Sequence, residues 1–180
     1  MDILAHGVWA IILIKFIKDQ FKIKAKLWQA FFFGIFPDII AFTFLTIWSF
    51  FNFGLIHPEK HGAEMIGTLG PTLSTISEVL YSFSHSLVVI GIIILVIFIV
   101  LKKIPIVLLA WPLHILLDIP THTSAFYPTP FLWPVSEITF SGIQWSNPLF
   151  MKINYAMMIF AICFLYRNDL IKCFKNINKK

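Results

Sequence analysis

Four histidines and two aspartates are spaced along the apolar part of the chain in a way that suits a metal site. Histidine nitrogens and carboxylate oxygens form the ligand set that zinc and similar divalent metals prefer. His114 and Asp118 are four residues apart, so on a helix their side chains would lie on one face, one turn from each other. The full candidate set is His6, Asp38, His85, His114, Asp118 and His122.

Two of the histidines also have ordinary structural explanations. A lone His6 near a helix end is typical of an interfacial residue, and a lone His85 among serines is typical of a histidine that packs between helices. Asp38 and Asp118 are harder to explain in this way, because a carboxylate without a lysine or arginine partner is costly inside a membrane. The carboxylates therefore favour a joint metal site. It would be either dinuclear with a bridging carboxylate, or a single ion with the other side chains as orienting groups and general base.

A second group of potential ligands consists of His57, His61 and Glu64. It lacks the His-Glu-x-x-His pattern of metalloproteases, because Pro58 stands where the glutamate would be. A solvated loop explains this group better than a metal site does. Glycine-rich nucleotide-binding motifs and the Gly-x-Ser-x-Gly motif of serine hydrolases do not occur in the sequence.

The elements that carry the candidate ligands are expected to lie in lipid. Of the 180 residues, 58% are hydrophobic and 13% are charged, and the mean hydropathy is +0.84. Too few charged groups remain to cover a soluble domain, so the composition predicts one domain (residues 1–180), an all-α bundle of about five membrane-spanning helices. Cys163 and Cys173 have no Cys-x-x-Cys spacing, and a disulfide framework is not expected.

Five apolar runs define the expected helices. The first is interpreted as a retained helix rather than a cleaved signal peptide, because its lysines follow the apolar stretch. The first and last runs have only about 15 residues, which is short for a hydrocarbon core of about 30 Å. The second contains Gly34 and Pro37, so a kink is expected there. The runs are residues 3–17, 27–56, 79–101, 104–119 and 153–166.

The basic residues predict the orientation of the bundle. Twelve of the fourteen lie in three clusters, at residues 15–26, 102–103 and 167–180. Placing these clusters in the cytoplasm leaves Lys60 and Lys152 outside, which puts the N-terminus outside and the C-terminus inside a cell (inner) membrane. The candidate ligands then lie toward the outer leaflet. The net charge of +5 is explained by topology, and no nucleic-acid partner is expected.

The segment of residues 123–147 is rich in proline and aromatic residues and too irregular to span a membrane. It is expected to cover the outer mouth of the bundle, or to lie in the headgroup zone where Trp133 and Trp145 are favoured. A loop that merely packs against the helices explains its composition equally well.

Five motifs, in order along the chain, resemble the bacterial and archaeal family of membrane-bound metal-dependent hydrolases. The order of histidines and aspartates is also remotely similar to that of zinc-dependent phospholipase C and related nucleases. This chain lacks their N-terminal tryptophan and second His-x-x-x-Glu pair, so the likeness implies two zinc ions rather than three. The motifs are Asp2-Ile3-Leu4-Ala5-His6, Gly34-Ile35-Phe36-Pro37-Asp38, Ser84-His85-Ser86-Leu87, His114-Ile115-Leu116-Leu117-Asp118 with Thr121-His122, and Leu132-Trp133-Pro134-Val135-Ser136.

The resemblance implies a zinc-dependent hydrolase that acts on a phosphoester or lipid-linked substrate at the outer leaflet, with membrane lipids as partners. The expected catalytic residues are Asp38, as general base or bridging ligand, and His122, as ligand or proton shuttle. The alternatives are a metal transporter, a metal-binding protein without catalysis, and a scaffold that has lost activity. A transporter would be expected to carry polar residues through the inner half of the bundle, whereas residues 92–101 are almost wholly apolar.

Reporter fusions after Pro71, Lys103 and Lys180 measure the predicted orientation. We expect an outer location for the first and a cytoplasmic location for the other two, because lysine-rich connections stay inside. A cytoplasmic reporter at Pro71 would overturn the orientation, and the outward-facing site with it.

Overall fold

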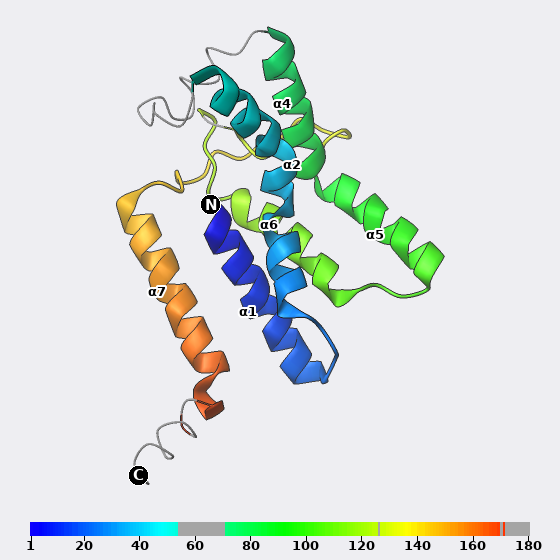
Figure 1. Cartoon of the computed structure of the whole chain (residues 1–180), viewed down its shortest axis with the longest axis vertical. Coiled ribbons are helices and arrows are strands. Elements are labelled where there is room, and N and C mark those ends of the chain that lie inside the picture. The colour runs from blue at the N-terminus through cyan, green and yellow to red at the C-terminus, as the bar shows by residue number, and fades with distance from the viewer. Residues whose placement is uncertain (54–70, 126, 170, 172–180) are drawn as a thin grey trace.

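The computed structural model describes residues 1–53, 71–125, 127–169 and 171. No β-strand occurs among them, so the predicted all-α class is confirmed. Figure 1 shows α1 and α2 in the middle of the molecule, α7 along one flank and α5 on the other. The elements are α1 (Ile3–Phe21), α2 (Leu27–Phe53), α4 (Pro71–Ser84), α5 (Leu87–Leu101), the 3₁₀ helix η1 (Ile106–Leu109), α6 (Ala110–Asp118) and α7 (Pro148–Leu165).

Local capping fixes where α1 begins and ends. Asp2 stands just before the helix, and its Oδ1 accepts a hydrogen bond from the Ala5 N–H at 2.9 Å. At the other end, Lys22 adopts a left-handed conformation with φ of 53°, and its N–H bonds to the Lys18 carbonyl. These caps place His6 in the first turn of α1.

Two glycines bring α1 and α2 into close contact. A Cβ atom added at Gly34 would lie 2.6 Å from the Ala10 Cβ and 2.9 Å from the His6 carbonyl oxygen. A Cβ added at Gly7 would lie 2.4 Å from the ring of Phe31. Small residues at such a crossing allow two backbones to approach as they do in helix pairs within membranes. The crossing sets His6 of α1 near Asp38, one turn beyond Gly34 on α2.

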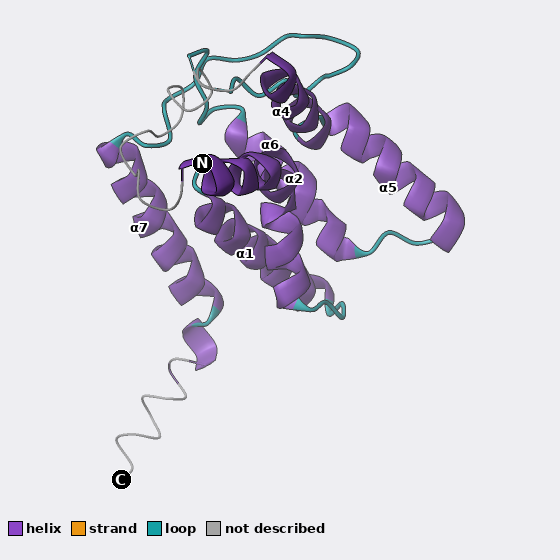
Figure 2. Ribbon diagram, turned by 45° about the horizontal axis from the view of Figure 1, so that its top comes forward, coloured by secondary structure: helices purple, strands orange, loops and turns teal. Residues whose placement is uncertain are grey.

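Helix α2 continues through Pro37 rather than ending there. Its ribbon changes direction along its length in Figures 1 and 2, as expected for a helix with an internal proline. Pro37 is fully buried in the bundle.

The apolar run of residues 79–101, expected to form one helix, is two helices. α4 ends at Ser84 and α5 begins at Leu87, with a bend of 56° between them. The Ser86 side chain caps α5 by accepting from the N–H groups of Val88 and Val89, and its hydroxyl donates to the Trp133 carbonyl. The backbone N–H groups that have no helical acceptor at the break are hydrogen-bonded to the Ser86 side chain, which makes the break tolerable. The break itself carries His85.

The fourth run is a 3₁₀ turn followed by a short α-helix. α6 ends at Asp118, before Pro120, so the helix stops ahead of His122. The following turn nevertheless stays close to the helix, because the His122 N–H bonds to the Asp118 carbonyl at 3.0 Å. His122 therefore remains beside the last turn of α6.

Among the described residues, fewer helices could cross a membrane than the five expected. Leu27–Trp48 and Pro148–Leu165 are long and apolar enough, and the bent pair Leu73–Ser84 with Leu87–Leu101 adds a third if it is one span. α1 has sufficient length but carries Lys15, Lys18 and Asp19 in its last two turns. The segment Ile106–Asp118 is apolar but too short. Charge and length, rather than a lack of apolar residues, explain the difference.

The α1/α2 crossing predicts a stability difference between two glycine variants. Gly34→Ala should lower the free energy of unfolding by about 1 to 3 kcal/mol, because the added methyl group meets Ala10 and the His6 backbone. The measurement is denaturant unfolding of the purified protein in detergent.

Gly91→Ala on α5 is the matched control, because no atom lies within 4 Å of a Cβ added there. It should be neutral, or stabilising by up to about 1 kcal/mol through helix propensity. Equal effects of the two substitutions would contradict the close crossing.

Candidate metal centre

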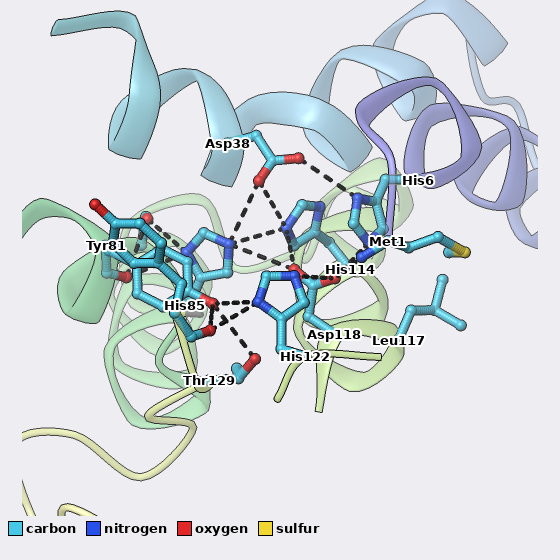
Figure 3. Close-up of polar contacts among 12 residues, drawn as sticks. Met1, His6, Asp38, Tyr81, His85, His114, Leu117, Asp118, His122 and Thr129 are labelled. Carbon is cyan, nitrogen blue, oxygen red and sulfur yellow. Dashed lines mark hydrogen bonds and ion pairs between the residues drawn. The ribbon is translucent and has the colours of Figure 1, made fainter. Parts of the chain in front are cut away.

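Six side chains from five segments of the chain meet in the interior of the bundle. Figure 3 shows the imidazoles of His6, His85 and His114 between the carboxylate of Asp38 and that of Asp118, with His122 beside Asp118. All six are buried, and none is more than 7% exposed. They come from α1 (His6), α2 (Asp38), the break between α4 and α5 (His85), α6 (His114 and Asp118) and the turn after α6 (His122).

Four of these side chains form a compact set, which we call the inner set: Asp38, His85, His114 and Asp118. One ligand atom of each lies within 4.8 Å of the others. The Nε2 atoms of His85 and His114 are 3.1 Å apart, and Asp38 Oδ1 is 3.6 Å from both. Asp118 Oδ2 is 3.5 Å from His85 Nε2 and 3.1 Å from His114 Nε2.

These five separations are close to the edge length of a metal-coordination tetrahedron, whose sixth edge, between the two carboxylate oxygens, is within 4.8 Å here. Four ligand atoms at about 2.0 to 2.1 Å from a zinc ion lie about 3.3 to 3.4 Å from one another. The five separations above, 3.1 to 3.6 Å, scatter around that value. The inner set thus has the size and the nitrogen and oxygen donors of a site for one divalent cation.

Backbone carbonyls orient three of the four imidazoles. Because a carbonyl oxygen can only accept, the Nδ1 atoms facing it carry the proton, and in the neutral ring this leaves the Nε2 lone pair free. His114 Nδ1 lies 2.7 Å from the Gly34 carbonyl oxygen, and His85 Nδ1 lies 3.1 Å from that of Tyr81. His122 Nδ1 lies 2.7 Å from the Tyr127 carbonyl oxygen. Histidines that ligate metals are typically held in this way.

The free Nε2 atoms point at groups that also carry lone pairs. His85 Nε2 and His114 Nε2 face each other and both carboxylates, so at most one proton could lie between the two rings. Asp38 Oδ2 and Asp118 Oδ2 have no hydrogen-bond donor, although buried acceptors almost always have one. A cation at the centre of the inner set would satisfy all four ligand atoms at once, whereas a shared proton would serve only one pair.

His6 and His122 lie on the other side of Asp118. Its Oδ1 is 2.9 Å from His6 Nε2 and 3.5 Å from His122 Nε2, while its Oδ2 faces the inner set. His6 Nδ1 is also 3.4 Å from Asp38 Oδ2, and its ring lies 3.8 Å from that of His114. Burial lowers the pKa of His122, which favours its neutral ring. The two oxygens of Asp118 therefore face two different groups of nitrogens.

Sequence reasoning missed two residues that contact this cluster. The Met1 amino group lies 2.6 Å from Asp118 Oδ1, a contact across 117 residues that no local pattern signals. Tyr81 stacks on His85 with ring centroids 4.0 Å apart, and its hydroxyl donates to the Tyr127 carbonyl oxygen at 2.8 Å. Tyr81 stands four residues before His85, a helical spacing that could have indicated this stacking.

The aromatic segment of residues 123–147 packs against the cluster. Its Tyr127 carbonyl fixes His122, its Phe131 carbonyl accepts from the Leu87 N–H at 2.9 Å, and its Thr129 is buried. These contacts fit both a covering role and a loop that packs against the helices.

Comparisons of the chain with protein-family models, curated proteins and solved structures each found no match. The ion pairs of Asp38 and Asp118 within the described residues involve histidines and the Met1 amino group, and no lysine or arginine. Two carboxylates in an apolar interior without such a partner are the chemical feature that a metal ion would explain. His57, His61 and Glu64 lie outside the described residues, so their predicted solvation stays a prediction.

The inner set predicts tightly bound divalent metal in the purified protein. His114→Ala and Asp118→Ala should each lower metal affinity by more than about 10²-fold, since even residues that only orient a ligand cost about 10- to 100-fold when lost. Elemental analysis after extensive dialysis measures the metal content.

His57→Ala serves as the histidine control and should retain the full metal content, because this residue is expected in a solvated loop. Full metal occupancy in His114→Ala would count heavily against the assignment.

Proposed function

We propose that this chain is a membrane-embedded, metal-dependent hydrolase that acts on a phosphoester or lipid-linked substrate. The observation that carries the proposal is the inner set, in which anchored Nε2 atoms and carboxylate oxygens surround a space of the size that a divalent cation fills. Nitrogen and oxygen ligands in tetrahedral arrangement favour zinc. A bound divalent ion supplies water activation and charge stabilisation at a phosphoryl or acyl group.

A two-ion site is the finer version of this proposal, with Asp118 as the bridge. Its Oδ2 belongs to the inner set, and its Oδ1 faces His6 and His122, which would hold the second ion in place of the Met1 amino group that lies 2.6 Å from the same Oδ1. Carboxylates bridge metals in many two-metal hydrolytic sites, where the ions stabilise both attacking and leaving oxygens. A metal-to-protein ratio of two would support the two-ion site, and a ratio of one would support the single-ion site.

The catalytic roles follow from the positions of Asp38 and His122. Asp38 Oδ2 lacks a hydrogen-bond donor and lies at the edge of the inner set, so it is placed to accept a proton from a nucleophilic water. His122, the most exposed of the six residues at 7%, lies in the turn after α6 and could pass a proton toward the loop side. These roles make Asp38 the base and His122 a ligand or shuttle.

The family resemblance supports the same assignment, because all five of its motifs reach the cluster. Asp2 caps the helix of His6, and Gly34 provides the carbonyl that orients His114. The last motif contributes through Trp133, whose carbonyl accepts from Ser86 next to His85. We therefore propose membership of the membrane-bound metal-dependent hydrolases, with a remote likeness to zinc-dependent phospholipase C.

The proposed setting is a cell membrane with the N-terminus outside. α1 and the segment Ile106–Asp118 would complete a five-helix bundle with the longer helices, although each is less suited to a span by charge or length. α1 carries His6 in its first turn and Lys18 in its last, and His85 precedes the start of α5 whereas Lys102 follows its end. This order supports a site in the leaflet opposite the lysines, which is the outer leaflet if the lysine-rich connections stay inside.

The activity test is cleavage of a phosphoester lipid by the purified protein in detergent or liposomes. Chelator should abolish turnover, and zinc or manganese should restore it. Asp38→Asn, assayed with saturating metal, should lower the rate about 10²-fold or more, because the amide keeps the size but cannot take a proton.

Asp19→Asn is the matched control, an exposed carboxylate paired with Lys15 at the far end of α1, and it should leave turnover unchanged. Undiminished turnover in Asp38→Asn would falsify the base role. Metal uptake into liposomes without any hydrolysis would favour the transporter instead.

A further inference from the structure

A pocket of about 460 Å³ lies where the end of α1, the connection to α2 and the start of η1 meet. Its polar wall consists of Lys18, Lys24, Lys26 and Gln29. Its apolar wall includes Ile106 and Val107 of η1. This lysine pocket is separate from the metal cluster, because none of its lining residues belongs to that cluster.

The three lysines of the pocket have no acidic partner. None of them forms an ion pair with another described residue, and the nearby Asp19 is already bound to Lys15 at 2.8 Å. Three like charges around one space repel each other unless an anion enters it. α2 begins at Leu27, directly after Lys26, and the positive end of its helix dipole adds partial positive charge at the same place.

The surroundings of the pocket indicate an anion that also carries an apolar part. Leu27 begins one of the two helices that are long and apolar enough to cross a membrane. Trp28 and Phe21, beside the pocket in sequence, are 65% and 66% exposed, which is typical of aromatic residues at the level of lipid headgroups. The interior next to the pocket is the apolar cluster of Ile14, Ala30 and Val107.

We infer that the lysine pocket binds the phosphate headgroup of an anionic phospholipid from the leaflet at the lysine-rich end of the bundle. The three ammonium groups and the start of α2 bind the phosphate, and the lipid chains lie against the exposed apolar side chains. Basic pockets between membrane helices bind such headgroups in general. The inference does not depend on the metal cluster or on its activity.

A diffuse positive surface is the competing explanation, and the chain offers a matched comparison. Lys22, Lys102 and Lys103 are exposed at connections of the same lysine-rich end, but they do not line the pocket. Replacing them removes three positive charges, the same number as replacing Lys18, Lys24 and Lys26. Diffuse attraction predicts equal losses in the two variants, whereas a pocket predicts a loss in only one.

The experiment titrates the full chain in detergent with phosphatidylglycerol or phosphatidylcholine and measures bound lipid by native mass spectrometry. We expect binding of phosphatidylglycerol in clear preference to phosphatidylcholine. The K18Q/K24Q/K26Q variant should bind phosphatidylglycerol about 10²-fold more weakly, whereas K22Q/K102Q/K103Q should remain within about threefold of the parent chain. Equal weakening of phosphatidylglycerol binding in both variants would overturn the assignment of the pocket as the binding site.

Two further arms separate folding and ligand source from the proposal. K18R/K24R/K26R keeps the charge and should retain binding, so a loss there as large as in the glutamine variant would also overturn the inference. Inorganic phosphate at millimolar concentration should displace little phosphatidylglycerol. Binding of inorganic phosphate at the same lysines with no preference for phosphatidylglycerol would identify a soluble anion and refute the lipid.

Discussion

Asp38 and Asp118 place two carboxylates inside an apolar helical bundle, and much of the structure can be understood as the means of accommodating them. A buried carboxylate costs several kcal/mol unless cations or donors surround it. Here the surrounding groups are four histidines and the Met1 amino group. Because three of the histidines turn Nε2 lone pairs toward the carboxylates, the arrangement remains short of positive charge unless a cation joins it.

The orienting carbonyls occur where the helices are irregular. Pro37 cannot donate to the carbonyl four residues before it and bends α2 near Gly34, whose carbonyl accepts from His114. The Tyr81 carbonyl lies in the last turn of α4, where it also accepts from the His85 N–H at 2.9 Å, and Tyr127 lies in a loop with φ of 43°. Backbone of this kind is tolerated at membrane depth only where it is buried in protein. The breaks in the helices and the anchoring of the histidines thus depend on each other.

Residue types and spacing predicted which six side chains come together, because ionisable residues stand out against an apolar background. The same background hid the break at residues 84–86, since a serine pair inside an apolar run has no periodicity of its own. The number of spans was overestimated because apolar length was counted without the charges of α1. The carbonyl partners could not be predicted at all. The bond between His114 and Gly34 joins residues 80 positions apart and depends on how α2 bends, which is a tertiary property.

The distribution of polar groups also bears on whether an ion bound in this cluster would serve catalysis or be transported. A transporter needs a binding site that releases its ion and a polar path on both sides. The inner set instead has histidines fixed by backbone carbonyls, and such preorganised ligands favour retention over exchange. On the lysine side, the apolar residues Ile14, Ala30 and Val107 pack together next to the lysine pocket. On the other side, the Tyr81 hydroxyl and the Tyr127 carbonyl lie beside His122. These polar groups lie on one side of the cluster, whereas a transporter needs a polar path on both sides.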